Sequence, residues 1–158
     1  MSGFLVAADH PESADVQALL DKHLAFARLA SPPEDVHALD VSGLLGASVS
    51  FFSIRAGGDL LGVGALMQLD GGHGELKSMH TAQAARGRGV GRAMLEHLVG
   101  TARVRGYGRL SLETGSMAAF APARALYRSA GFEFCEPFGE YLLSPHSSYL
   151  TLDLRQQG

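Results

Sequence analysis

The sequence predicts an α/β (α+β) fold in which helices pack on a mixed β-sheet. Three observations predict it: two long segments carry apolar residues at helical spacing, three β-rich runs with glycine turns lie between them, and shorter strands and helices alternate afterwards. The chain has 158 residues, of which 46% are hydrophobic and 18% charged, a size and composition typical of one folded domain. We therefore expect residues 1–158 to form a single domain.

The first half of the chain is expected to open with a strand at 4–8 and a helix at 14–30. The segment Ser31-Pro32-Pro33 ends this helix, because proline cannot continue the hydrogen-bond ladder. A second, shorter helix is expected at 34–39, with Pro33 in its first turn. The apolar residues that set the spacing of the first helix are Val16, Leu19, Leu20, Leu24 and Ala27.

Three consecutive strands are expected to form an antiparallel meander. The runs 48–55 and 60–69 flank Gly57-Gly58, which predicts a hairpin with a glycine turn. Asp70-Gly71-Gly72 makes the next turn, and residues 75–81 add the third strand.

The second half of the chain alternates helices and strands. Apolar residues at four-residue steps from Val90 to Ala102 predict a helix over 89–105, which ends at Gly106. The remaining elements are expected at 110–114 (strand), 123–130 (helix, opened by Pro122 and ended by Gly131), 132–135 (strand) and 149–154 (strand).

Composition argues against several classes of function. A net charge of −3, from 13 basic and 16 acidic residues, disfavours a nucleic-acid partner. No apolar run reaches the roughly 18 residues of a membrane span, and the first residues show no signal-peptide pattern, so we expect a cytoplasmic protein without a membrane partner. Cys135 is the only cysteine, which excludes an intrachain disulfide, and the histidines lack the spacing of metal ligands, so no metal is expected.

The most informative segment is Arg86-Gly87-Arg88-Gly89-Val90-Gly91-Arg92, which follows a predicted strand and opens a predicted helix. Its alternating glycines remove side chains where the backbone must approach a ligand closely. The unbonded amides of the following helix turn and the positive end of the helix dipole favour an anion there. Six arginines against one acid, Glu96, make residues 86–109 locally basic. The segment therefore predicts a phosphate cradle.

Two other phosphate-binding motifs and a loop without a ligand are the alternatives for this segment. A Walker-type loop needs Gly-Lys-Ser/Thr, which the chain does not contain. A dinucleotide fingerprint needs G-x-G-x-x-G near the first strand of a parallel unit, whereas this spacing is G-x-G-x-G after an antiparallel meander. The remaining alternative is a flexible Gly/Arg loop without a ligand.

The segment also resembles a known family. The pattern Arg86-x-x-Gly89-x-Gly91 is similar to the Q/R-x-x-G-x-G/A signature of the GCN5-related N-acetyltransferase (GNAT) superfamily. Residues 75–80 resemble the strand before that signature, and residues 125–132 resemble the family's later segment around a tyrosine, which ends in Gly-Phe. The segments 112–116 and 122–124 resemble a subgroup of small bacterial acetyltransferases. Together these motifs cover about residues 45–135.

The resemblance implies the GNAT fold, a mixed, mostly antiparallel sheet that splays between its two central parallel strands and carries helices on both faces. It implies that the loop amides bind the pyrophosphate of acetyl-CoA. It also implies that the preceding strand bulges near Met79-His80-Thr81, pairs with the pantetheine arm and polarises the thioester carbonyl. The coenzyme would lie as a pseudo-strand between the strand ending near Thr81 and the one beginning near Leu110. The expected coenzyme contacts are Met79, His80, Thr81, Arg86, Gly87, Arg88, Gly89, Val90, Gly91, Arg92 and Ala123.

Tyr127 matches the general acid of the family, which protonates the departing CoA thiolate. The alternative is a tyrosine that only packs in the core. His80 is expected to contribute its backbone and no proton transfer. Cys135 is expected to be a small apolar packing residue.

Two glutamates compete for the role of general base. Glu75 precedes Arg86 by eleven residues, which is the register of the base in the histone acetyltransferase branch of the family. Strand alternation puts Glu75, Lys77 and Met79 on one face up to any bulge, and a neighbouring ammonium would weaken the carboxylate as a base. A surface pair of Glu75 with Lys77 is therefore the alternative. Glu113, at the start of a Glu-Thr-Gly turn, is the competing base.

The resemblance implies transfer of an acetyl group from acetyl-CoA to a primary amine of a small molecule or peptide, directly within a ternary complex. Segments 31–45 and 138–149 are expected to border the acceptor, with Phe120 as a wall. Alternatives are an acyl-CoA-binding sensor or partner module without catalysis, transfer of another acyl group, and a nucleotide-phosphate binder. A homodimer is left open, since family members are often dimers.

Overall fold

The computed structural model describes residues 4–31, 41–139 and 141–155, so the helix expected at 34–39 lies outside the described residues. Every other predicted helix and strand is confirmed, with ends that differ by two residues or fewer. The strands are β1 (Leu5–Ala8), β2 (Val49–Ala56), β3 (Asp59–Asp70), β4 (His73–Thr81), β5 (Arg109–Gly115), β6 (Glu133–Phe134) and β7 (Ser147–Asp153). The helices are α1 (Ala14–Ala30), α2 (Val41–Leu44), α3 (Val90–Val104) and α4 (Ala121–Ser129), with 3-10 turns η2 (Gln83–Ala85) and η3 (Ala118–Phe120).

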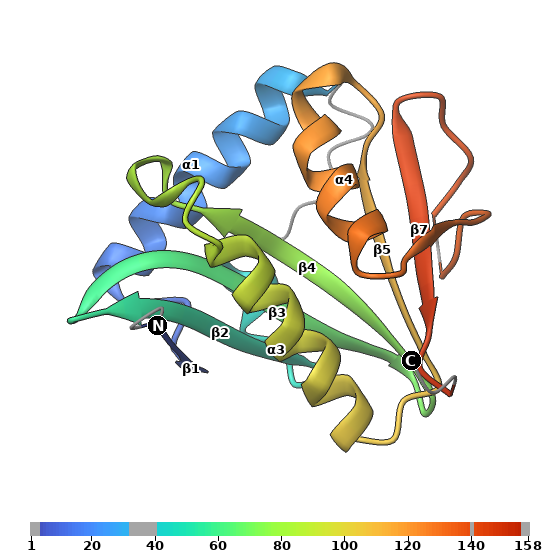
Figure 1. Ribbon diagram of the computed structural model, residues 1–158, viewed down its shortest axis with the longest axis horizontal. Coiled ribbons are helices and arrows are strands. Elements are labelled where there is room, and N and C mark those ends of the chain that lie inside the picture. Colours follow the sequence, from blue (N-terminus) through green and yellow to red (C-terminus); the bar gives the residue numbers. More distant parts are fainter. Residues whose placement is uncertain (1–3, 32–40, 140, 156–158) are drawn as a thin grey trace.

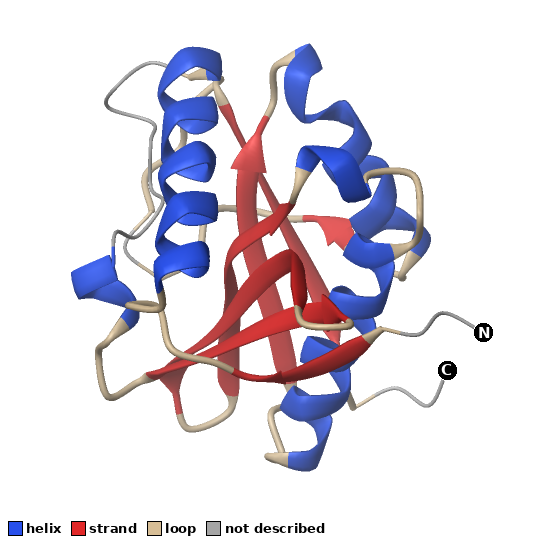
Figure 2. Ribbon diagram, turned by 90° about the vertical axis from the view of Figure 1, so that its left-hand side faces the viewer, coloured by secondary structure: helices blue, strands red, loops and turns tan. Residues whose placement is uncertain are grey.

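The described strands form one seven-stranded sheet in the order β1-β2-β3-β4-β5-β7-β6. Neighbouring strands are antiparallel except β4 and β5, which are parallel. Helix α1 covers one face of the sheet, and α3 and α4 cover the other (Figures 1 and 2). We call these the α1 face and the α3 face.

Helix α3 packs close to the sheet because β3 carries glycines beneath it. A Cβ on Gly64 would lie 2.8 Å from Met94 Cγ, and one on Gly62 would lie 3.0 Å from Val90 Cγ1. Real Cβ atoms essentially never lie as close as 2.8 Å to a neighbour and seldom as close as 3.0 Å, so the glycines allow Val90 and Met94 to be buried in the main core. This close packing fixes where α3 begins relative to β4.

The parallel strands β4 and β5 pair only at one end. Their register runs over three positions, from His73 opposite Arg109 to Glu75 opposite Ser111. Beyond Glu75 and Ser111, β4 continues to Thr81 and β5 continues to Gly115 without pairing with each other. The sheet therefore splays between its two central parallel strands, as expected.

A β-bulge in β4 lies where the strands diverge. His80 pairs with Val63 and Lys77 pairs with Ala65, so two β4 residues lie opposite Gly64. One of them, Ser78, has a φ of 56°, in the left-handed region that residues with a side chain rarely adopt. The bulge, formed by Ser78 and Met79, begins one residue before the expected position near Met79-His80-Thr81 and increases the local bend of the strand.

The bulge also marks where the side-chain alternation expected for β4 ends. Glu75 and Lys77 share the α1 face as alternation predicts, but Met79 does not join them. The extra residue reverses the alternation, so Met79 packs against the core of the α3 face. His80 consequently returns to the α1 face, where it meets His23 of α1.

Candidate functional site

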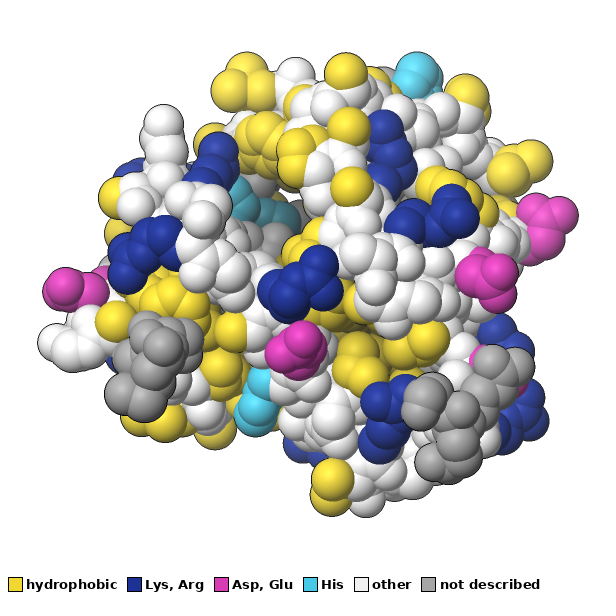
Figure 3. Space-filling view, viewed as in Figure 1, with side chains coloured by type: hydrophobic (Ala, Val, Ile, Leu, Met, Phe, Trp, Pro, Cys, Tyr) yellow, Lys and Arg dark blue, Asp and Glu magenta, His cyan; other side chains and the backbone are white. Residues whose placement is uncertain are grey.

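A cavity of about 590 Å³ occupies the gap between β4 and β5. Residues of α1, η2, η3, α4 and the start of α3 complete its wall. Figure 3 shows it as a hollow bordered by basic side chains, with histidine visible inside. The cavity thus brings together residues from both faces of the sheet. The predicted site residues on its wall are Glu75, Met79, His80, Thr81, Arg86, Gly87, Gly89, Val90, Gly91, Arg92, Glu113, Ala123 and Tyr127.

The first turn of α3 presents unbonded amides to this cavity. Gly87 and Gly89 have φ values of 76° and 82°, a conformation that glycine adopts without strain. The first helical hydrogen bond runs from the Ala93 amide to the Gly89 carbonyl, at 3.0 Å. Since Gly89 caps the helix without a side-chain bond, the amides of Val90 and Gly91 have no helical acceptor. This arrangement suits an anion.

Two of the three arginine side chains of this segment, those of Arg88 and Arg92, have partners of their own. Arg92 donates from Nη2 to Ser129 Oγ on α4, at 2.8 Å. The Arg88 guanidinium lies over the Phe4 ring, 5.8 Å from its centroid, and is absent from the cavity wall. The hydrogen-bonding surface of the predicted cradle is therefore main chain, and the arginines add positive charge around it.

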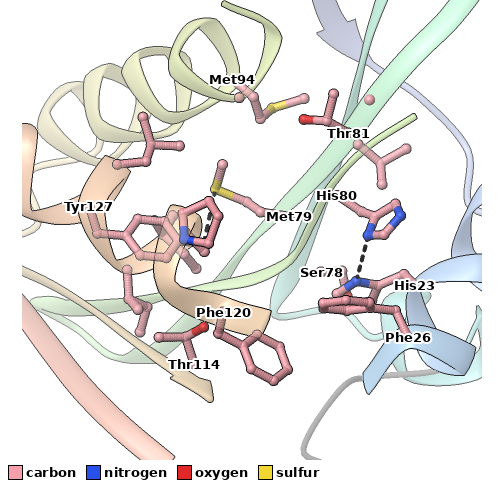
Figure 4. Close-up of a pocket in the computed structure, with 18 of the residues that line it drawn as sticks. His23, Phe26, Ser78, Met79, His80, Thr81, Met94, Thr114, Phe120 and Tyr127 are labelled. Atoms are coloured by element: carbon pink, nitrogen blue, oxygen red, sulfur yellow. Dashed lines mark hydrogen bonds between the residues drawn. The ribbon is translucent and has the colours of Figure 1, made fainter. Parts of the chain in front are cut away.

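Tyr127 lies on α4 with 8% of its surface exposed. Its hydroxyl is 4.0 Å from Met79 Sδ, on the α3 side of the gap (Figure 4). Burial, and then the charge of Glu113, raises the pKa of Tyr127 to about 12. The hydroxyl is therefore protonated at neutral pH and can donate a hydrogen bond into the cavity.

The loop before α4 is fixed by Arg124. Its Nη1 donates to the carbonyls of Gly115 and Met117, at 2.6 and 3.0 Å. Gly115 is required here, because a Cβ would lie 2.2 Å from the Phe120 ring. These contacts set the position of Phe120, which lines the cavity.

Glu75 belongs to a buried polar cluster on the α1 face. It is 2% exposed, its Oε2 accepts a hydrogen bond from the Tyr141 hydroxyl at 2.5 Å, and Lys77 Nζ lies 3.3 Å from the same oxygen. Lys77 also donates to the Tyr141 hydroxyl, at 2.9 Å. The pair expected as the alternative to catalysis thus exists, but it is buried rather than on the surface. Burial, and then the Glu75 carboxylate, raises the pKa of Tyr141.

His23 and His80 form a second polar pair on the α1 face of the cavity. Their Nδ1 atoms are 3.2 Å apart, and their rings meet edge to face with centroids 5.1 Å apart (Figure 4). Burial, followed by nearby positive groups, lowers the pKa of each to about 4. Sequence reasoning missed His23. The available signal was its position three residues after buried Leu20, on the inward stripe of α1.

Among the described residues, neither a cluster of metal ligands nor a helix able to cross a membrane is present. They include no cluster of three or more His, Cys, Asp or Glu side chains that could hold a metal ion. No helix among them has the length and apolar character that a membrane span requires.

Comparisons of this chain with a family model, with known sequences and with solved structures agree with one another. The sequence model of the acetyltransferase (GNAT) family matches residues 16–132. The chain is 46% identical over 149 residues to YsnE of Bacillus subtilis, described as an uncharacterized N-acetyltransferase, covering 94% of this chain and 99% of YsnE. It is similar to a crystal structure described as an acyl-CoA N-acyltransferase from Klebsiella pneumoniae, with a TM-score of 0.83, 28% identity and coverage of 98% and 99%. A GNAT family acetyltransferase from Elizabethkingia anophelis with acetyl-CoA bound shares the fold, with a TM-score of 0.71, 17% identity and coverage of 97% and 99%.

Proposed function

The chain belongs to the GNAT acetyltransferase family, and from that premise we propose that it transfers an acetyl group from acetyl-CoA to a primary amine of a small molecule or peptide. We propose direct transfer, with both substrates bound together. The observation that carries this proposal is the unpaired stretch of β4 and β5 beyond Glu75 and Ser111. It joins an anion-binding helix start on one side of the sheet to a polar pocket on the other.

The coenzyme's diphosphate would accept hydrogen bonds from the amides of Val90 and Gly91. The main chain of Met79 to Thr81 faces β5 across the gap without pairing to it, so its polar groups can bond to the pantetheine arm. An amide in this stretch would polarise the thioester carbonyl and stabilise the negative charge that develops on it.

Transfer needs an amine nitrogen to attack the carbonyl carbon while the carbon–sulfur bond breaks and its electron pair goes to sulfur. Tyr127 is proposed to donate its hydroxyl hydrogen to that sulfur. Burial favours this role, because it keeps the phenol protonated. Met79, whose Sδ is 4.0 Å from the Tyr127 hydroxyl, would hold the ring beside the gap.

The acceptor amine would enter from the α1 face. Glu75 and Glu113 line the cavity there, and their negative charge would attract a cationic amine. The Glu75 carboxylate already has Tyr141 and Lys77 as partners, so its proposed role is electrostatic. Glu113 remains the carboxylate to be tested as a base.

A thiol-release assay with acetyl-CoA and a panel of primary amines tests the proposal. We expect turnover with at least one amine and its loss in Tyr127→Phe, with acetyl-CoA binding retained in that variant. Binding of acetyl-CoA without turnover across a wide panel would instead support a sensor. Displacement of CoA by ATP would support a nucleotide-phosphate binder.

A further inference from the structure

We propose that the His23–His80 pair is the proton acceptor for the attacking amine, which it serves as a two-ring relay. This inference rests on the proposed function and concerns the same cavity. The two side chains come from α1 and β4 and line the cavity together. His80 directly follows Met79 in the bulge, so it extends from the strand segment that borders the thioester toward the side from which the amine enters.

The geometry of the pair determines what it offers to a substrate. The Nδ1 atoms are 3.2 Å apart, so one of them carries the hydrogen and the other accepts it. In a neutral imidazole, the ring that donates through Nδ1 has an unprotonated Nε2, and its partner carries a hydrogen on Nε2. The pair therefore always presents one basic Nε2 and one Nε2–H.

The surroundings favour passing a proton on over storing it. The positive charge of Lys77 acts on His23, and the positive charges of Arg86 and Lys22 act on His80. These basic residues and burial disfavour an imidazolium, and both pKa values are lowered to about 4. Neither ring is therefore expected to keep an added proton. A proton accepted by one ring is expected to pass to the other ring and then to solvent.

Each proton transfer in the relay breaks one bond to hydrogen and forms another. The amine reacts in its neutral form, after its ammonium proton has gone to solvent. One of its nitrogen–hydrogen bonds then breaks, the electron pair of that bond stays on the nitrogen that becomes the amide, and the proton bonds to the basic Nε2. The Nδ1 hydrogen of that ring moves to the Nδ1 of the partner ring. The partner then releases its Nε2 hydrogen to solvent, so no charge stays on the pair. After the product leaves, the first ring loses its Nε2 hydrogen to solvent, the Nδ1 hydrogen moves back to it, and the partner takes a proton from solvent on Nε2, which restores both rings.

The carboxylate with the family's register for the base is poorly placed to do this. Glu75 is 2% exposed and its Oε2 has Tyr141 and Lys77 as partners. By contrast, Ser78 lies two residues before His80 on the cavity wall, and its Oγ is buried with no hydrogen-bond partner in the described part of the chain.

The test compares His23→Gln, His80→Gln and the double variant, measured with an amine that the wild type acetylates. Glutamine keeps a donor and an acceptor but cannot relay a proton. We expect each single variant to lower kcat by about 10²–10⁴-fold, with acetyl-CoA affinity within about twofold of wild type. Because the relay needs both rings, the double variant should be no slower than the slower single variant.

His73→Gln is the matched control. His73 is also on β4 and hydrogen-bonded, to Ser111 Oγ at 2.7 Å, but does not line the cavity. It should keep wild-type turnover. If a glutamine variant no longer binds acetyl-CoA, the asparagine variant at the same position is measured in its place.

Full turnover in either single variant, or losses that add in the double variant, would overturn the relay. So would removal of the acidic limb of the pH profile by Glu113→Gln alone. A wild-type protein that binds acetyl-CoA but acetylates no amine would overturn the proposed function and the relay with it.

Discussion

Gly89 can separate coenzyme binding from folding when it is compared with Gly58. Gly89 has a φ of 82° at the start of α3, and Gly58 has a φ of 90° in the turn between β2 and β3. A Cβ on either residue would meet nothing within 4 Å. Alanine at either position therefore introduces backbone strain of about 1–2 kcal/mol without a clash. In a chain of this length, that strain lowers the melting temperature by roughly 2–8 °C.

Only Gly89 lies on the cavity wall. Relief of the strain there would turn the amides of Val90 and Gly91 away from the bound anion. Loss of one hydrogen bond to a charged group costs about 1.5–3 kcal/mol, so acetyl-CoA should bind about 10- to 150-fold more weakly to Gly89→Ala. Calorimetric titration of both variants measures this, and Gly58→Ala should bind like wild type. Wild-type affinity in Gly89→Ala would refute the claim that these amides hold the diphosphate.

Three further predictions concern Tyr127, Glu75 and Gly64. Tyr127→Phe should lower kcat by about 10²–10⁴-fold, and since burial raises the pKa of Tyr127 to about 12, the wild-type pH profile should show no loss from this group between about pH 7 and 10. Glu75→Gln should lower the free energy of unfolding in urea by about 3–5 kcal/mol, because it removes the buried negative charge that Lys77 and Tyr141 both contact; an unchanged midpoint would contradict the buried pair. Gly64→Ala should cost about 1–3 kcal/mol in the same assay, because its Cβ would lie 2.8 Å from Met94 Cγ; a neutral result would mean that α3 is not packed tightly on β3.

Local signals allowed the elements to be predicted, together with the position of the helix start that we propose binds the coenzyme. The glycine and arginine spacing of residues 86–92 is a property of consecutive residues, and so is the apolar spacing of α3. The cradle needs only main-chain amides at a helix start, so its position follows once the helix start is known. The helix α2 was not predicted because its four residues are too few to show a period.

The side of the cavity that we propose for the acceptor depends on contacts between distant parts of the chain. His23 and His80 are 57 residues apart, and Tyr141 and Glu75 are 66 residues apart. No local period links such residues, so sequence reasoning could weigh Glu75 against Lys77 but could not find Tyr141 beside both. It also treated His80 as a backbone contact, because its partner on α1 could not be identified.

The bulge at Ser78 accounts for most of what makes the two sides of the cavity different. With regular alternation after Lys77, Met79 would face α1 and His80 would face α3. The one extra residue exchanges them, so a thioether lies beside Tyr127 and an imidazole lies beside His23. The same residue bends β4 where its pairing with β5 has ended. Ser78, with its backbone in the left-handed region, thus lies where the gap between β4 and β5 opens. The bulge at this residue places the proposed proton donor, Tyr127, and the proposed proton acceptor, the His23–His80 pair, on opposite faces of the sheet.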